Sequence, residues 1–199
     1  MKRKWVFAFE EGDGKNKMLL GGKGANLCEM TQIGLNVPPG FVITTDACLA
    51  FLDKDRLPEG AMEETLAHMK ALEKKTGKTF GGGDNPLLVS VRSGSSMSMP
   101  GMMDTVLNLG LNPVTLKGLI AQTGNARFGY DAWRRFIQLF GKIALGIADE
   151  HFDAAMALIK SRYGAAQDID LKAEHLAELA TEFLGIVQRH TGKPFPEDP

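Results

Sequence analysis

Hydrophobic and polar positions alternate differently in the two parts of the chain. Before Gly110, short apolar runs of strand length are interleaved with segments whose apolar residues recur every three or four positions. The runs predict strands at 4–9, 41–44, 87–91 and 105–109, and the periodic segments predict helices at 19–33, 45–52 and 61–76. Asn112 is predicted to cap a helix with Pro113 in its first turn. From there every pattern is helical, with expected helices at 115–122, 126–147, 149–163 and 171–190. The sequence therefore predicts an α+β protein: an α+β region at 1–111, a helical subdomain at 112–193 and a proline-rich linker at 194–199.

The stretch from Leu87 to Gly110 carries the first candidate chemistry. Its sequence, LLVSVRSGSSMSMPGMMDTVLNLG, places Arg92 at the end of a predicted buried strand and follows it with serines and glycines. Glycines let the backbone approach a ligand, successive amides can form a concave anion site, and an arginine fork matches phosphate oxygens. These residues predict phosphate binding, with an ordinary exposed turn as the alternative.

A second cation, Lys23, stands between Gly22 and Gly24 where a helix is expected to begin. Free amides and the helix dipole favour an anion at such a position. The segment is not a Walker A motif, since Lys17 and Gly24 occupy the places of its first glycine and its Ser or Thr. The alternative is a solvated lysine.

Composition and charge argue against several classes of function. The chain has 199 residues, 44% hydrophobic and 24% charged, and a net charge of −1, so no basic surface points to nucleic acid. No apolar run reaches the roughly 18 residues of a membrane span. Cys28 and Cys48 lie in apolar, helix-like stretches, which predicts reduced thiols in a cytoplasmic protein. The four histidines are scattered, so none is assigned to metal, and the arginines at 127, 134 and 135 are expected to be solvated.

Three segments together resemble one enzyme family. They are GGKGANLCEM (21–30), VPPGFVIT (37–44) and VSVRSGSSMSMPGMMDTVLNLG (89–110). Essentially the whole chain resembles the nucleotide-binding domain of the pyruvate, phosphate dikinase family. Phosphoenolpyruvate synthase and other water dikinases share the KGANL-like segment and remain an alternative, but the PGMMDT string favours the phosphate-dependent family.

The resemblance implies the first lobe of an ATP-grasp-type domain with an inserted helical subdomain. It also implies that Lys23 and Arg92 contact the phosphates of ATP and act in catalysis. The nucleotide site implied by matching the family is Lys23, Arg92, Ser93, Gly94, Gly101, Met102, Met103, Asp104 and Thr105.

The family's remaining parts are expected outside this chain. They are a second lobe whose carboxylates hold Mg²⁺, a domain with the phosphorylated histidine, a pyruvate-binding barrel and the regions that form a homodimer. The chain is thus expected to be a truncated piece that is inactive by itself. The alternative is a truncated non-catalytic module that binds a nucleotide or a partner.

Overall fold

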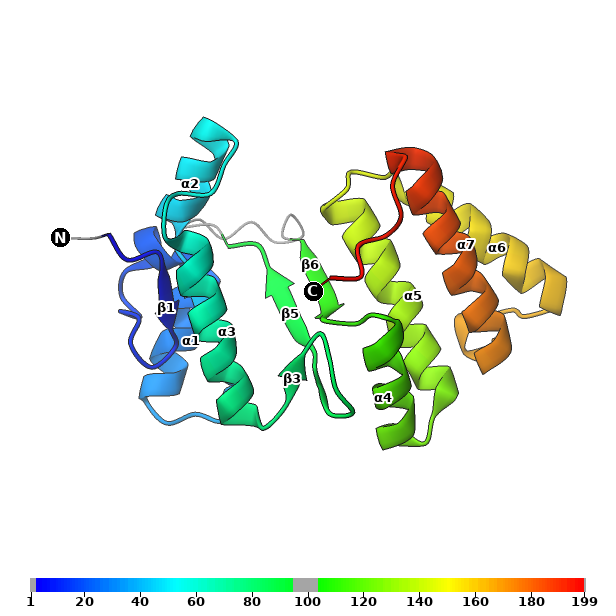
Figure 1. Cartoon of the computed structure of the whole chain (residues 1–199), viewed down its shortest axis with the longest axis horizontal. Coiled ribbons are helices and arrows are strands. Elements are labelled where there is room, and N and C mark those ends of the chain that lie inside the picture. The colour runs from blue at the N-terminus through cyan, green and yellow to red at the C-terminus, as the bar shows by residue number, and fades with distance from the viewer. Residues whose placement is uncertain (1–2, 95–103, 199) are drawn as a thin grey trace. The chain divides into compact units, whose positions relative to one another are not determined.

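A computed structural model describes residues 3–94 and 104–198 of the chain (Figure 1). The described residues fall into two compact units: unit 1 contains 3–77 with 93–94, and unit 2 contains 78–92 with 104–198. Both contain helices and small sheets, which confirms the α+β class. No helix in the described ranges is long and apolar enough to cross a bilayer.

Unit 1 packs helices against a two-stranded antiparallel sheet. The register pairs Val6 with Ile43 and Ala8 with Phe41. Its small core contains Phe9, Leu20, Ala25 and Cys28. The elements are β1 (Val6–Ala8), α1 (Lys17–Gln32), β2 (Phe41–Ile43), α2 (Thr45–Lys54) and α3 (Ala61–Thr76).

A carboxylate from α3 covers the open edge of β1. Glu64 Oε2 accepts hydrogen bonds from the backbone amides of Trp5 (2.7 Å) and Val6 (2.9 Å). An unpaired strand edge exposes donors that would otherwise be left to solvent or to another chain. Glu64 therefore ties α3 to the sheet at the point where the strand begins.

Unit 2 combines two small sheets with a helical bundle. Its core is formed mainly by α5 and α7, with Phe152 of α6 against Phe183 of α7. The predicted cap at Asn112 is confirmed, because its side chain accepts from the amides of Val114 and Thr115 (both 2.9 Å). The elements are β3 (Thr79–Phe80), β4 (Pro86–Leu87), β5 (Val89–Arg92), β6 (Thr105–Leu109), α4 (Pro113–Thr123), α5 (Ala126–Ile143), α6 (Asp149–Tyr163), the 3₁₀ turn η1 (Asp168–Asp170) and α7 (Ala173–Thr191).

The boundary between the units differs from the expected division at 111/112. Residues 78–92 and 104–111 pack with the helices, because Val106 and Leu111 belong to the helical core and Asn108 Nδ2 donates to the Ala132 carbonyl of α5 (3.4 Å). The division therefore falls at Gly77/Lys78. The expected loop at 78–86 also contains the short parallel pair β3 and β4.

The predicted buried strand at 87–91 is buried only at its start. Leu87 is buried, whereas Val91 is 48% exposed. Within the described residues β5 and β6 form a two-stranded sheet, so β5 has a paired strand at one edge only and is not the central strand of a larger sheet. Apolar, β-branched composition identified the strand but not its surroundings.

Arg134 corrects the expectation of a solvated arginine. Its side chain is only 6% exposed and pairs with Asp131 (2.7 Å) and with Asp168 of η1 (3.2 Å). Lys160 also pairs with Asp168. Lys160, together with Arg134, lowers the pKa of the Asp168 carboxyl against the opposing effect of burial. A buried charge is tolerated when it is paired, and this network joins α5 to the connection between α6 and α7.

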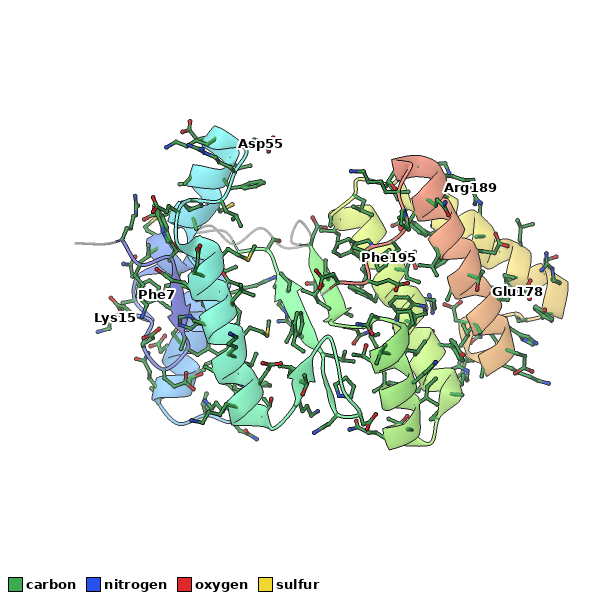
Figure 2. All side chains as sticks on the ribbon, in the orientation of Figure 1. Phe7, Lys15, Asp55, Glu178, Arg189 and Phe195 are labelled. Carbon is green, nitrogen blue, oxygen red and sulfur yellow. The ribbon has the colours of Figure 1, made fainter. Side chains whose placement is uncertain are left out.

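The expected linker at 194–199 is also corrected where it is described. Phe195, labelled in Figure 2, is only 6% exposed. Its ring lies 5.4–5.7 Å from the rings of Trp133, Phe136 and Phe140 of α5. Gly192 ends α7 in a left-handed conformation, and the prolines that follow do not prevent the residue between them from packing into the core.

We expect Phe195→Ala to lower the free energy of unfolding of unit 2 by about 3–5 kcal/mol, because it removes a buried ring and leaves a cavity. Urea unfolding in a Trp5→Phe background would make Trp133 the fluorescent reporter of unit 2. Glu197→Ala, an exposed neighbour in the same segment, is the matched control. A loss for Phe195→Ala no greater than that of the control would contradict the packing of this segment.

Candidate functional site

A break in α1 determines the surroundings of Lys23. The helix starts normally, with the Asn16 side chain accepting from the Leu19 amide (3.1 Å). Gly21 then leaves the helical conformation at φ 68° and ψ 161°, and the helix resumes after it. This region of conformational space is accessible essentially to glycine alone. Lys23 consequently lies in the first turn of the resumed helix, at a helix start as the sequence predicted.

The flanking glycine, Gly24, sets how closely this helix approaches the sheet. A Cβ atom built at Gly24 would lie 2.8 Å from Cγ1 and 3.0 Å from Cγ2 of Val42 in β2. Real Cβ atoms do not approach other carbons this closely, so only glycine permits the observed spacing. The start of the resumed helix is thus pressed against β2.

The Lys23 side chain is partly exposed, and its ammonium has no hydrogen-bond or ion-pair partner among residues 3–94 and 104–198. The first amides of a helix lack acceptors within their own helix. This end of the resumed helix therefore combines a cation with amide donors, an arrangement that suits an anion.

Arg92 occupies the end of a β-hairpin in unit 2. It is the last residue of β5 and is paired in register with Thr105, the first residue of β6. The structure therefore brings these two candidate residues together, with residues 93–104 as the connection between the strands. Arg92 is exposed, and no described residue pairs with its guanidinium.

A bulge bends this hairpin, and sequence reasoning missed it. Between the pairs Val89–Leu109 and Val91–Val106, β6 contains one extra residue. Asn108 accommodates it with a left-handed φ of 60°, a conformation that asparagine adopts more readily than most residues. Bulges redirect side chains and are common near functional sites. The one sequence feature that indicated this bulge was the asparagine at position 108, within an otherwise apolar strand.

The remaining candidates lie in the connection itself. Ser93 and Gly94 are exposed after β5, and Asp104 is exposed before β6. Asp104 lies near enough to Lys142 for its charge to help raise the pKa of that ammonium, although Asp149 has the larger effect. Gly101, Met102 and Met103 lie outside the described residues. Lys23 belongs to unit 1 and Arg92 to unit 2.

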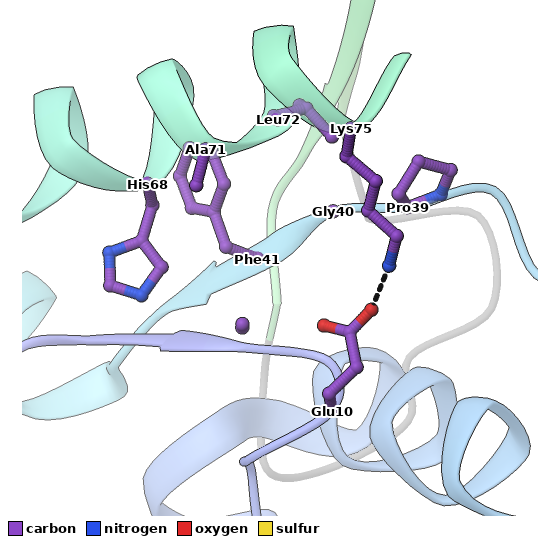
Figure 3. A pocket seen from close by; sticks show the side chains of 9 residues that line it. Glu10, Pro39, Gly40, Phe41, His68, Ala71, Leu72 and Lys75 are labelled. Atoms are coloured by element: carbon purple, nitrogen blue, oxygen red, sulfur yellow. Dashed lines mark hydrogen bonds and ion pairs between the residues drawn. The ribbon is translucent and has the colours of Figure 1, made fainter.

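Two cavities formed by residues 3–94 and 104–198 are each too small for a nucleotide. One of about 60 Å³ lies in unit 1 (Figure 3), where Glu10 pairs with Lys75 beside Phe41 and His68. The other, of about 200 Å³, lies between β6, α5 and the 196–198 segment. Small-molecule sites usually have roughly 300–1,000 Å³.

Charges beside the smaller cavity are mutually satisfied. Lys75 lowers the pKa of Glu10. Burial raises the pKa of Glu11, but hydrogen bonds from Lys4, the Ala8 amide and His68 outweigh it and lower that pKa to about 2. These contacts hold α3 to the segment after β1, and they leave no carboxylate of this group uncompensated.

No three side chains of His, Cys, Asp or Glu gather into a possible metal site within the described ranges. Asp104 is the one acid inside the candidate loop that the sequence singled out, and a single carboxylate is a poor ligand set for Mg²⁺.

Comparison with known proteins assigns these features to a class. Residues 17–78, which include Lys23 and its flanking glycines, match the family model described as pyruvate phosphate dikinase, AMP/ATP-binding domain. The segment that contains Lys23 is therefore similar to an AMP/ATP-binding domain, the class of domain with which the α+β fold is consistent. Arg92 lies beyond the residues that this model matches.

Relatives cover nearly the entire chain. It is 56% identical over 195 residues to the pyruvate, phosphate dikinase of Entamoeba histolytica. These aligned residues cover 98% of this chain and 22% of that protein. The chain is 50% identical over 183 residues to the Giardia intestinalis enzyme (92% of this chain, 21% of that protein) and 43% identical over 198 residues to the Clostridium symbiosum enzyme (98% and 23%). Over nearly its whole length the chain is thus similar to pyruvate, phosphate dikinases, and it spans about a fifth of the length of these relatives.

The close approach at Gly24 can be tested by a compensating pair of substitutions. We expect Gly24→Ala to destabilise unit 1 by about 1–3 kcal/mol, because the added methyl group overlaps Val42. Val42→Ala should remove the overlap, so the double variant should lose less than the sum of the two single losses. Urea unfolding followed by Trp5 fluorescence in a Trp133→Phe background measures all three variants; simple additivity would show that the two residues do not meet.

Proposed function

We propose that this chain is part of the ATP-binding region of a pyruvate, phosphate dikinase. The observation that carries the proposal is the match of residues 17–78 to an AMP/ATP-binding domain. Inside the matched segment Lys23 lies at a helix start, and its ammonium has no partner among the residues that the structure describes. The complete enzyme would convert ATP, pyruvate and phosphate into AMP, phosphoenolpyruvate and diphosphate. The phosphohistidine that carries the transferred group would lie outside this chain.

Lys23 and Arg92 would neutralise phosphate oxygens while the phosphoryl group is transferred. Phosphoryl transfer depends mainly on positioning and on electrostatic stabilisation, which fixed cations and amides supply. A guanidinium can bind two phosphate oxygens at once, whereas an ammonium acts as a point charge. The two residues therefore have related but distinct roles in this proposal.

The segment from Ser93 to Thr105 would close over the phosphates and exclude water. Gly94 and Gly101 would let its backbone approach them, Met102 and Met103 would pack against apolar parts of the nucleotide, and Asp104 would lie at its base. The pairing of Arg92 with Thr105 supports this role, because it fixes both ends of the loop on one hairpin.

In the complete enzyme magnesium would supply positive charge that helps to neutralise the phosphates of ATP. The described residues offer no ligand set that fits it. We therefore assign the metal's carboxylates to a part of the enzyme outside this chain.

The proposal extends to architecture. Residues 1–111 would supply the first lobe of an ATP-grasp-type domain and residues 112–193 its helical insertion, even though compact packing groups 78–92 and 104–111 with the helices. The complete enzyme would act in the cytoplasm and form a homodimer through regions outside this chain.

Lys23→Ala and Arg92→Ala in the complete enzyme should each slow phosphorylation of the enzyme by ATP by about 10²–10³-fold, as removal of one oxyanion donor does. Arg92→Lys should recover little activity, because lysine lacks the bidentate fork. Phosphorylation by phosphoenolpyruvate should survive all three changes.

Exposed lysines outside the proposed site serve as controls: Lys17, which precedes the break in α1, and Lys117 on α4. Rapid-quench measurement of phosphoenzyme gives both half-reactions. Near-normal phosphorylation by ATP in the two alanine variants would exclude the proposed roles, and an equal loss in both half-reactions would make the residues structural.

The 199-residue chain by itself should have no dikinase turnover. Without a metal site or an acceptor histidine, incubation with ATP, magnesium, phosphate and pyruvate should release no AMP above background. AMP formation that scales with the amount of chain would show that metal ligands and an acceptor lie within it.

A further inference from the structure

Thr45, the first residue of α2, contacts α1 at its break. The Thr45 Oγ1 hydroxyl donates to the Met18 carbonyl at 2.5 Å, and the Leu19 carbonyl lies 3.2 Å from the same oxygen. These are long-range contacts, because Met18 and Thr45 are 27 residues apart in the chain. The single hydroxyl hydrogen is therefore directed at two adjacent carbonyls of the first turn of α1.

Those two carbonyls have a specific place in helix geometry. In an unbroken α-helix the carbonyl of residue i accepts from the amide of residue i+4. Met18 would thus accept from Gly22, and Leu19 would accept from Lys23. Gly21, which lies between these carbonyls and these amides in the sequence, departs from the helical conformation. The Thr45 hydroxyl lies within hydrogen-bond distance of both carbonyls. The hydroxyl takes the position that the amides of Gly22 and Lys23 would occupy if the helix closed.

The support for this hydroxyl is rigid. Thr44, next to it, is 1% exposed and caps α2 by accepting from the Ala47 amide (3.2 Å). Its own amide donates to the Trp5 carbonyl (2.9 Å), which continues the pairing of β1 with β2. On the other side of the break, Val42 of β2 presses against Gly24. The strand and the helix that follows it therefore hold α1 both before and after Gly21.

We infer that Thr45 is a positioning residue for the nucleotide site: it stabilises the broken form of α1 and thereby sets the direction of Lys23 and its amide. This inference rests on the proposed function of Lys23. Without the hydroxyl, the carbonyls of Met18 and Leu19 lose their side-chain donor. The Met18 carbonyl is exposed and can turn to water, whereas the Leu19 carbonyl is partly buried. A partly buried carbonyl needs another partner, and the amide of Lys23 is the nearest one to Leu19 by helix geometry. Closure of the helix would turn Lys23 away from its present direction and engage amides that the phosphate would use.

Thr45→Val is the direct test, because valine keeps the shape of the side chain and removes the hydroxyl. In the complete enzyme we expect the rate of phosphorylation at saturating ATP to fall by about 10–10²-fold, the range that a displacement of about 1 Å can cause. Phosphorylation by phosphoenolpyruvate should be unchanged. Thr45→Ser, which keeps the hydroxyl, should be faster than Thr45→Val.

Thr31→Val is the matched control. Thr31 Oγ1 also donates to a carbonyl of α1, that of Leu27 at 2.8 Å, but in the continuous part of the helix. If the loss came from general weakening of α1, the two valine variants should behave alike. We expect Thr31→Val to keep its rate of phosphorylation by ATP.

Hydrogen exchange of the Gly22 and Lys23 amides separates positioning from destabilisation. Closure of the helix should make these amides exchange more slowly in Thr45→Val than in the parent enzyme without nucleotide, whereas general destabilisation makes them exchange faster. Slower exchange with a reduced rate of phosphorylation supports the inference. Unchanged or faster exchange, or a phosphorylation rate no lower than that of Thr31→Val, overturns it.

Lys23→Ala measured in parallel shows which claim has failed. If Lys23→Ala phosphorylates normally, the proposed function of Lys23 is wrong. If Lys23→Ala is impaired while Thr45→Val is normal, the proposed function stands and the inference about Thr45 alone is wrong.

Discussion

The conformation of Gly21 is the constraint on which the candidate site depends. Its φ of 68° and ψ of 161° interrupt α1 one turn after it begins. A side chain at this position would be strained, since L residues rarely occupy this region. The interruption places a second helix start inside the family's matched segment, and Lys23 occupies its first turn. Gly24 then lets this start approach β2 closely enough to contact Val42. Two glycines thus act in different ways on one lysine, the first through backbone freedom and the second through the absence of a Cβ atom.

The two units have different sources of rigidity. Unit 2 has an extended apolar core that α5 and α7 share, and Phe195 and the ion pairs of Arg134 add contacts to it. Unit 1 has only four buried residues in its cluster and relies more on polar ties, such as Glu64 to β1 and Gln32 to the Phe9 and Gly12 carbonyls. A charge-assisted hydrogen bond contributes about 1.5–3 kcal/mol. Hydrogen bonds also fix the orientation of the elements that they join, which apolar burial alone does not. A lysine that binds phosphate requires such a fixed orientation of its helix.

Local signals in the sequence predicted the elements well. The helix at 61–76 and the strand at 105–109 have the predicted bounds, and Asn112 caps α4 as its type and position indicated. The start of a helix at Lys23 was also predictable, because glycines flank it. Features that depend on distant residues were not. The burial of Phe195 needs the rings of α5, the pairing of Arg134 needs Asp168, and the contact of Thr45 with Met18 spans 27 residues. Periodicity reports only which residues are apolar, and it contains no information on which partner a polar group meets.

A structure of the complete enzyme with a non-hydrolysable ATP analogue tests the central claim most directly. The account predicts a phosphate oxygen within about 2.7–2.9 Å of Lys23 Nζ, the length of a charge-assisted hydrogen bond, with Gly21 still at positive φ. It would be contradicted by phosphates bound away from Lys23, or by an α1 that runs through Gly21 without a break when the nucleotide is bound.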